Sequence, residues 1–337
     1  MSSLPEGLLD AGAWFRVEEA ASASAVRRAA ERLATSLAMP ERRRADLSIM
    51  VAEAAGNLVK HADQGVMLIR TVRNEDDAGV EVIAVDSGPG MADVMRSAGD
   101  GHSTAGTLGI GLGAILRQAT WSDLYSVPGK GTVLAAQVWP ATAPAPTWAS
   151  GIVRALTGEH VSGDGYAVRT ADGRRQMMVV DGLGHGPLAA TAAQVAVRTF
   201  DNAPAGAPST LVEALHRALG HTRGAALAIA EIDQDAEVLR YAGLGNISGS
   251  ILSVSAGRRG LVSLPGIAGH QRRQIRQYDY PFPAGSVLLM HTDGVVDRWR
   301  SEEYPGLLSR SPQVIAATVL RDAGTRRDDA GVLVAKP

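Results

Sequence analysis

Residues 181–186 read Asp-Gly-Leu-Gly-His-Gly and follow directly on the apolar run 176–180. An apolar run of this length predicts a buried strand. Asp is depleted within strands, so a carboxylate at the point where a strand ends needs a reason. Asp-Gly also forms plain turns, and we interpret Asp172-Gly173 as one. Asp181 instead closes a strongly apolar strand, which favours a functional site.

Three other carboxylates occupy similar positions in the second half of the chain. They are Asp164 in Ser-Gly-Asp-Gly, Asp293 after the predicted strand 286–290, and Asp328, with Asp329 beside it, before the predicted strand 330–335. Converging carboxylates in a chain with no cysteine favour hard cations, Mg²⁺ or Mn²⁺. Two such cations lower the pKa of a bridging water and hold a phosphate for in-line attack. We predict Asp181 as the bridging ligand.

The second half as a whole predicts many strands and few helices. The predicted strands are 166–170, 176–180, 225–232, 237–242, 247–254, 286–291 and 330–335, and the predicted helices are 187–200, 208–220 and 311–323. Antiparallel strands interrupted by paired helices favour two sheets with helices outside.

The clearest break in the chain is the proline-rich stretch 140–146. Prolines favour extended backbone, and the intervening Ala and Thr offer little to pack. We predict a linker at 141–150 between a first domain at 10–140 and a second domain at 151–337, each of ordinary domain size.

The first half predicts helices that cover an antiparallel sheet. Apolar residues at helical spacing run from Val26 to Leu37, and a second helix begins at Pro40. Strands are predicted at 66–72, 80–85 and 133–139. This arrangement is a two-layer α/β sandwich, so the fold class of the chain is α/β (α+β).

Three polar residues of the second helix share one face, since Glu53, Asn57 and His61 are spaced by four. A carboxylate and an amide one turn apart can hold a hydrated Mg²⁺. The alternative is a solvated polar stripe.

Two glycine-rich segments follow this helix. Asp86-Ser-Gly-Pro-Gly90 closes a predicted strand, where glycines let the backbone pass close to a flat ligand. Residues 106–113 read Gly-Thr-Leu-Gly-Ile-Gly-Leu-Gly and lead into a predicted helix at 114–119, which is typical of an anion cradle. The run does not open a βαβ unit, so a dinucleotide-binding fold is excluded.

Composition excludes several classes of function. The 337 residues carry a net charge of −2, which gives no electrostatic case for nucleic acid or an anionic membrane. The absence of cysteine excludes disulfides, thiolate metal sites and cysteine nucleophiles. We find no secretory signal and no apolar run of membrane-spanning length, and we expect a cytoplasmic protein.

Four motifs stand in the order found in the GHKL ATPase superfamily, which residues 15–140 resemble. Residues 53–62 resemble its N box, 86–90 its G1 box, 106–113 its G2 box and 129–132 its closing motif. No phosphoacceptor His box precedes the N box, so the half is more similar to the bacterial anti-sigma-factor serine kinases than to sensor histidine kinases. Residues 100–113 are especially similar to the stressosome switch kinase of that family.

That resemblance implies a site for ATP or ADP with Mg²⁺. Asn57 would ligate Mg²⁺, and Glu53 would position or deprotonate the attacking hydroxyl. Asp86 would read the adenine amino group, supported by Thr132. Lys60 and His61 would contact phosphate or cap the helix. The other expected nucleotide contacts are Gly88, Gly90, Gly106, Thr107, Leu108, Gly109, Gly111 and Leu112.

Residues 151–337 resemble the type 2C metal-dependent protein phosphatases, in the SpoIIE-like bacterial branch that acts on sporulation and stress regulators. The resemblance implies an αββα sandwich with two Mn²⁺ or Mg²⁺. The implied metal ligands are Asp164, Asp181, Gly182, Asp293 and Asp328. Many relatives carry a further Asp where this chain has Ala167, and Asp329 could replace Asp328. His185 would protonate the leaving serine oxygen or contact phosphate, or it is only structural.

Together the resemblances imply a bacterial stress or sigma-factor signalling switch protein. The second half would remove phosphate from Ser or Thr of a STAS-domain (anti-sigma-antagonist-like) partner, and the first half would add it from ATP. In one alternative the first half is only a nucleotide-sensing regulator of the phosphatase. In another it is a partner-binding module without chemistry. A homodimer is left open.

Overall fold

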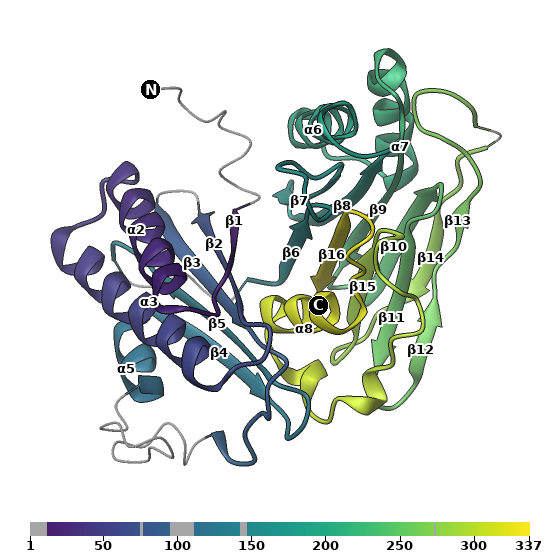
Figure 1. Cartoon of the computed structure of the whole chain (residues 1–337). Helices are drawn as coiled ribbons and strands as arrows, with labels where there is room; N and C mark the ends of the chain where they lie inside the picture. Colours follow the sequence, from purple (N-terminus) through teal and green to yellow (C-terminus); the bar gives the residue numbers. More distant parts are fainter. Residues whose placement is uncertain (1–11, 75–76, 95–110, 142–146, 273) are drawn as a thin grey trace. The chain divides into compact units, whose positions relative to one another are not determined.

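The computed structural model describes residues 12–74, 77–94, 111–141, 147–272 and 274–337. The chain divides into two compact units, Met1–Pro146 and Thr147–Pro337, and each is described by itself (Figure 1). The boundary falls inside the segment 141–150, where the sequence predicts a linker. Among the described residues, no helix combines the length and apolar character needed to cross a membrane.

The first unit is built on an antiparallel five-stranded sheet with the strand order β1-β2-β3-β5-β4. Its strands are β1 (Ala13–Arg16), β2 (Val66–Arg73), β3 (Ala78–Val85), β4 (Trp121–Ser126) and β5 (Thr132–Val138). Its described helices are α2 (Ala20–Ser36), α3 (Glu41–His61) and α5 (Gly111–Gln118). Figure 1 shows the helices together on one face of this sheet.

Apolar stripes hold these two layers together. Val26 and Ala30 of α2 and Met50 of α3 are buried in one cluster with alternating residues of the sheet, such as Met67 and Val82. Side chains two apart on a strand share a face, so this face of the sheet meets the helices. The predicted two-layer sandwich is therefore confirmed.

The opposite face of the same sheet carries a buried polar row. Arg70 and Glu81 are register partners on β2 and β3, and Glu81 is in turn the partner of Gln137 on β5. The guanidinium of Arg70 lies 2.5 Å from the Glu81 carboxylate, and Gln137 Nε2 donates to Glu81 Oε1 at 2.7 Å. Trp139 Nε1 completes the row by donating to Gln137 Oε1 at 2.8 Å.

The second unit contains two sheets. The six-stranded sheet has the order β13-β10-β9-β8-β7, with β14 also pairing β10, and the five-stranded sheet has the order β12-β11-β15-β16-β6. The strands of the first are β7 (Asp164–Ala171), β8 (Arg174–Gly182), β9 (Ala225–Asp233), β10 (Val238–Leu244), β13 (Ser263–Leu264) and β14 (Tyr278–Pro281). Those of the second are β6 (Ala149–Arg154), β11 (Ser248–Ser253), β12 (Gly257–Gly260), β15 (Val287–His291) and β16 (Ala330–Ala335).

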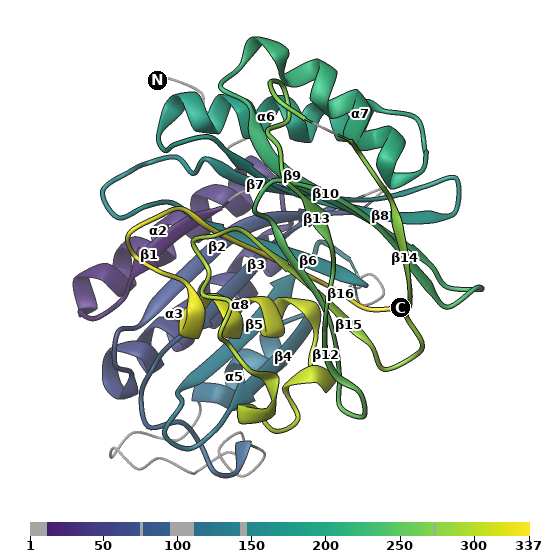
Figure 2. The same ribbon diagram turned by 90° about the vertical axis from the view of Figure 1, so that its right-hand side faces the viewer.

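Helices cover the outer faces of these sheets (Figure 2). A core that includes Val179, Ala228, Leu288 and Leu333 lies between the two sheets. A second core joins the outer face of the six-stranded sheet to α6 (Pro187–Asn202) and α7 (Pro208–Ala218). Helix α8 (Pro312–Ala323) is buried along most of its length and packs beside β6 and β16. The layers are αββα, as predicted.

Three short helical turns complete this unit. They are η1 (Leu219–His221), η2 (Ser301–Glu303) and η3 (Leu307–Ser309). The predicted long strands and helices are confirmed, whereas β1, β4, β6, β12, β13 and β14 were not predicted. These six are short or carry polar side chains at inward positions, so they lack the apolar pattern from which a strand is predicted. One placement was wrong, because Asp181 lies within β8 rather than after its end.

Candidate functional site

The first pair of the predicted carboxylates lies on two neighbouring strands. Asp164 is the first residue of β7, and it is the register partner of Asp181 on β8. Directly opposed residues of an antiparallel pair project to the same face, with Cβ atoms about 4.5–5.5 Å apart. Val179 and Met177 share this face with Asp181 and belong to the core between the sheets. Both carboxylates therefore lie at one end of the interior of the sandwich.

The other sheet brings its carboxylates to the same place. Asp293 follows β15, and Asp328 and Asp329 precede β16, its neighbour in the sheet. Thr292 Oγ1 donates to Asp164 Oδ2 at 2.7 Å, which links the end of β15 directly to the start of β7. The predicted convergence thus depends on two strand ends from each sheet.

Asp329 and Asp328 have different environments. Asp329 is 3% exposed, and its two oxygens accept hydrogen bonds from Leu156 N and Gly163 N, each at 2.6 Å. Asp328 is exposed, and Oδ1 accepts from Asp329 N at 2.9 Å. Because the oxygens of Asp329 already fix the loop before β7, the geometry favours Asp328 as the metal ligand and Asp329 as the residue that positions this loop.

Two further polar side chains hold the carboxylates in place, and sequence reasoning missed both. Thr292 is fully buried, and its hydroxyl also accepts from Gly331 N at 2.9 Å. Asn246 Nδ2 donates to Asp293 Oδ2 at 2.8 Å. The two come from different parts of the chain, so no local motif marks them as a pair. Thr292 does stand directly before Asp293 in the sequence, which was the one available signal.

The carboxylates interact strongly enough to change their protonation. Burial, followed by repulsion from Asp293 and Asp328, raises the pKa of Asp181 to about 7. Burial and the charge of Asp181 hold the pKa of Asp164 well above its ordinary value. Lost hydration, followed by Asp328, raises the pKa of Asp293. Such mutual repulsion is the electrostatic environment that a multivalent cation relieves.

The donor set fits Mg²⁺ or Mn²⁺ in kind, because every predicted side-chain ligand is a carboxylate. Within the described residues, however, no three carboxylate or imidazole groups lie close enough together to enclose an ion. The charges of Asp293 and Asp328 nevertheless raise the pKa of Asp181, so the carboxylates of the two sheets interact across the end of the sandwich. Gly182, at the end of β8, has no room for a side chain, because a Cβ atom there would collide with Ala189 of α6.

His185 stands four residues after Asp181, in the loop between β8 and α6. Its side chain is 62% exposed, and Nδ1 lies 3.1 Å from Oε1 of Glu159. The carboxylate of Glu159 therefore orients the imidazole without burying it. An exposed, oriented imidazole can deliver a proton to an atom that enters from solvent.

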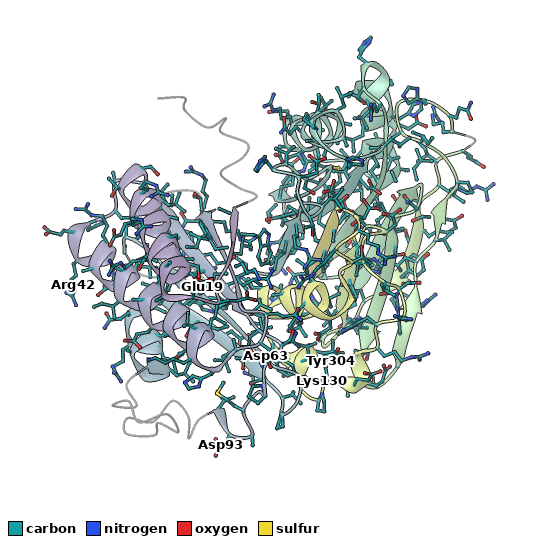
Figure 3. The ribbon with its side chains drawn as sticks, in the orientation of Figure 1. Glu19, Arg42, Asp63, Asp93, Lys130 and Tyr304 are labelled. Atoms are coloured by element: carbon teal, nitrogen blue, oxygen red, sulfur yellow. The ribbon has the colours of Figure 1, made fainter. Side chains whose placement is uncertain are left out.

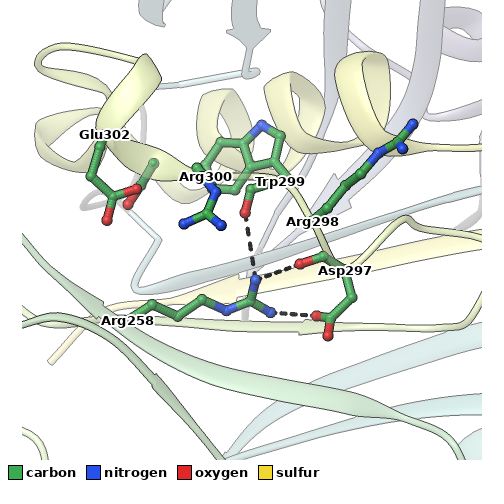
Figure 4. Close-up of a pocket in the computed structure, with 7 residues that line it drawn as sticks. Arg258, Asp297, Arg298, Trp299, Arg300 and Glu302 are labelled. Carbon is green, nitrogen blue, oxygen red and sulfur yellow. Dashed lines mark hydrogen bonds and ion pairs between the residues drawn. The ribbon is translucent and has the colours of Figure 1, made fainter.

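A separate cavity of about 140 Å³ follows Asp293 along the chain (Figure 4). Arg258 lies along its wall, donating to the carbonyl of Asp297 at 2.7 Å and pairing with its carboxylate at 2.5 Å. Trp299, whose ring stacks on Tyr304, forms another side. None of the predicted site residues lines this cavity, and the Arg258 guanidinium is already neutralised there.

In the first unit, the predicted N-box residues face the start of α5. A Cβ atom on Gly111 would lie 3.1 Å from Asn57 Oδ1 and 3.3 Å from Glu53 Oε2. The two side chains of α3 therefore meet the N-terminus of α5, where backbone N–H groups favour an anion. Leu112 follows in the same turn and is half-buried.

The predicted G1 and closing motifs lie against each other. Asp86 N donates to Thr132 O at 3.0 Å, and Gly88 N donates to Asp86 Oδ1 at 2.8 Å. Ser126, which sequence reasoning missed, joins them through a 3.0 Å hydrogen bond between its hydroxyl and that of Thr132. Gly90 lies so close to Val127 that a side chain there would collide with it.

The end of α3 reaches the same edge of the sheet. Lys60 and His61 are exposed, and Ser87 N donates to Asp63 O just after the helix at 3.0 Å. Figure 3 shows Asp63 and Lys130 toward this edge, where β2 and β5 begin and β3 ends. The predicted contacts Gly106, Thr107, Leu108 and Gly109 lie outside the described residues.

Comparison with known families matches each half of the chain to a separate family model. Residues 16–137 match the family model of the histidine kinase-like ATPase domain, and residues 171–337 match that of stage II sporulation protein E, SpoIIE. The first unit also matches the serine/threonine-protein kinase RsbT of Bacillus subtilis, with 36% identity over 95 residues, which are 28% of this chain and 71% of RsbT. The first unit belongs to the RsbT-like ATPases, and the second unit is similar to the SpoIIE-type phosphatases.

The SpoIIE-type unit has relatives of its own. It matches the phosphoserine phosphatase RsbX of Bacillus subtilis, with 24% identity over 173 residues, which are 51% of this chain and 85% of RsbX. A solved structure described as part of the bacterial stressosome, a modular system adapted to control secondary messenger signalling, has 29% identity and a TM-score of 0.52. That match covers 56% of this chain and 98% of the other. The chain therefore joins a stressosome-related kinase-like domain to a serine/threonine phosphatase domain of the type 2C class.

Proposed function

We propose that this chain sets the phosphorylation state of serine or threonine on a partner protein, with hydrolysis in the SpoIIE-type unit. The observation that carries the proposal is the convergence of Asp164, Asp181, Asp293 and Asp328 from the strand ends of two facing sheets. The similarity to RsbX, a phosphoserine phosphatase, supports a phosphoserine substrate.

Two Mg²⁺ or Mn²⁺ ions bound by these carboxylates would supply charge neutralisation and an activated water. The residues of the chain have separate tasks around them. Asp181, whose pKa responds to carboxylates of the other sheet, would be among the residues that hold the ions. Thr292 and Asn246 keep Asp164 and Asp293 oriented through single hydrogen bonds. His185, oriented by Glu159, would give a proton to the leaving serine oxygen.

The RsbT-like unit would bind ATP with Mg²⁺ and transfer phosphate to the same partner. Asn57 would hold Mg²⁺, Glu53 would position the attacking hydroxyl, and Asp86 would read the adenine. Positioning and charge neutralisation are most of what phosphoryl transfer requires. The packing of Asn57 and Glu53 against Gly111 supports this assignment. The partner that fits both relatives is a STAS-domain protein.

The experiment uses the full chain and its STAS-domain partner. With Mn²⁺, the wild type should dephosphorylate the phosphoserine form of the partner, and Asp181→Asn should lose at least about 100-fold in rate, because metal ions supply several kcal/mol to such reactions. With ATP and Mg²⁺, Asp181→Asn should accumulate phosphorylated partner, and the double variant with Glu53→Gln should not. Hydrolysis that persists in Asp181→Asn would remove the phosphatase assignment.

A second candidate shares the same nucleotide site. Glu53 and Asn57 facing Gly111 also suit a domain that binds ATP or ADP and regulates the phosphatase without transferring phosphate. This candidate predicts that Asn57→Ala changes phosphatase turnover while no label passes from ATP to the partner.

A further inference from the structure

Arg223 lies beside the loop that follows Asp181, and nothing in the site described so far uses it. A Cβ atom built on Gly184 would lie 3.1 Å from Arg223 Nη1. Gly184 also lies next to the loop before β7, because a Cβ atom built on Gly163 would lie 3.4 Å from the carbonyl oxygen of Gly184. Gly163 N in turn donates to Asp329, so the loop beside the Arg223 guanidinium packs against the loop that Asp329 holds.

The backbone of Arg223 is held on both sides. Thr222 Oγ1 accepts from Gly224 N at 3.0 Å and donates to Leu219 O at 2.8 Å, which closes a tight turn around the arginine. Gly224 O accepts from Leu183 N at 3.0 Å, which ties this turn to the Asp181 loop. The side chain therefore starts from a fixed point, and less entropy is lost when it binds a ligand.

The charge of Arg223 is not neutralised within the described part of the chain. The residue is exposed, and no described carboxylate lies within ion-pair distance of it. Two other arginines of the unit, by contrast, are engaged: Arg169 donates to carbonyls at the end of α6, and Arg240 pairs with Glu231. Arg223 therefore has no carboxylate partner among the described residues and lies beside the loop that follows Asp181. Its guanidinium is available to bind an external anion.

We propose that Arg223 binds the phosphate group of the phosphoserine or phosphothreonine substrate at the carboxylate site. This inference rests on the proposed phosphatase activity. The five aspartates around the site, Asp164, Asp181, Asp293, Asp328 and Asp329, repel a phosphate dianion even when divalent cations offset part of their charge. A guanidinium is always protonated and matches phosphate oxygens with two parallel N–H donors.

The glycine at position 184 is part of the same arrangement. Its φ of +88° favours glycine, and a Cβ atom there would press against the Arg223 guanidinium. The Asp-Gly-Leu-Gly sequence thus provides a carboxylate and, three residues later, a glycine that leaves room for the arginine.

The test uses the full chain with Mn²⁺ and two substrates, p-nitrophenyl phosphate and a phosphoserine peptide. Arg223→Gln should raise KM for both, and the inhibition constant of inorganic phosphate, by about 10- to 100-fold, the range for hydrogen bonds to charged groups. Arg223→Lys should recover part of the loss. Arg198→Gln, an exposed arginine on α6, is the matched control and should behave as wild type. Mn²⁺ affinity, measured by calorimetry, should not change in Arg223→Gln.

Two results would overturn the inference alone. One is wild-type KM and phosphate inhibition in Arg223→Gln. The other is a loss of activity that comes entirely from weaker Mn²⁺ binding. If the wild type hydrolyses neither substrate with Mn²⁺ or Mg²⁺, the proposed function itself fails, and this inference fails with it.

Discussion

Asp164 and Asp181 are directly opposed on β7 and β8, with both carboxylates on the face that meets the second sheet. Like charges in such a pair destabilise a sheet. This strand pair carries two like charges, and Asp293 and Asp328 add two more from the facing sheet. The arrangement lowers the stability of the fold, as is typical of functional sites. The following predictions test the parts of that arrangement and its counterpart in the RsbT-like unit.

The repulsion at Asp181 should appear as a pH dependence of stability when a chelator is present. Its folded-state pKa of about 7 lies above the ordinary 3.8, so the folded protein keeps a proton that the unfolded chain has lost. This contribution is complete below about pH 4 and is lost as the pH rises through about 7. Between pH 5 and pH 8, wild type should lose roughly 5 °C of melting temperature relative to Asp181→Asn. A constant difference between the two across this range would contradict the assignment.

Thr292 should be needed for both stability and metal affinity. Thr292→Val removes the donor to Asp164 and leaves Gly331 N without its acceptor in a fully buried place. We expect a loss of about 1–3 kcal/mol in the free energy of unfolding, the cost of unsatisfied buried groups. Mn²⁺ affinity should fall about 10- to 100-fold, as for other residues that orient metal ligands. Thr292→Ser keeps the hydroxyl and is the control, with near wild-type Mn²⁺ binding in calorimetry.

Gly111 and Gly56 form a matched pair for the nucleotide site. Gly111→Ala places a methyl group against Asn57 and Glu53 and should weaken ATP binding by about 10-fold, or about 1.4 kcal/mol. Gly56 lies on α3 between those residues, and a Cβ atom there meets nothing within 4 Å. Gly56→Ala should leave ATP affinity unchanged and stabilise the helix by roughly 0.5–1 kcal/mol. Equal ATP affinities for the two variants, measured by calorimetry, would argue against the site.

Removing one charged partner from the buried polar row of Arg70, Glu81 and Gln137 should lower the free energy of unfolding, but replacing both charged partners by apolar residues should not. Glu81→Ala removes the fully buried carboxylate that pairs with the buried Arg70 and should cost about 3–5 kcal/mol in denaturant unfolding. Replacing both partners, as Arg70→Met with Glu81→Leu, should come close to the wild-type stability. A double variant as unstable as the single one would show that Gln137, and not the charge, decides the loss.

Much of the fold could be predicted from the sequence because its long elements carry a strong local pattern. The period of α3 and the apolar run of β8 are each visible within one stretch of chain. Strands such as β12, whose four residues are Gly-Arg-Arg-Gly, carry no such pattern and form only because β11 lies beside them. Their stability comes from pairing, which depends on residues far away in the sequence.

The candidate carboxylates were named from the sequence, which preferred Asp328 as the ligand but left Asp329 open as its replacement. Asp328 and Asp329 are adjacent and chemically identical, and only the tertiary structure shows that Asp329 is occupied by Leu156 and Gly163. Thr292, Asn246 and Arg223 were missed altogether. Thr292 and Asn246 act on Asp164 and Asp293, which are far away in the sequence, and only folding brings Arg223 beside Gly184.

The sequence by itself determined which residue types stand at the strand ends: aspartates beside glycines in one half, and glutamate, asparagine and glycine-rich turns in the other. This follows because composition and periodicity are local properties of the chain. The tertiary structure decided which of them share a site, because β7 and β8 pair within one sheet while Thr292 reaches Asp164 from the other. The ends of the two sheets have to meet before the aspartates can repel one another and before Thr292 can hydrogen-bond to Asp164.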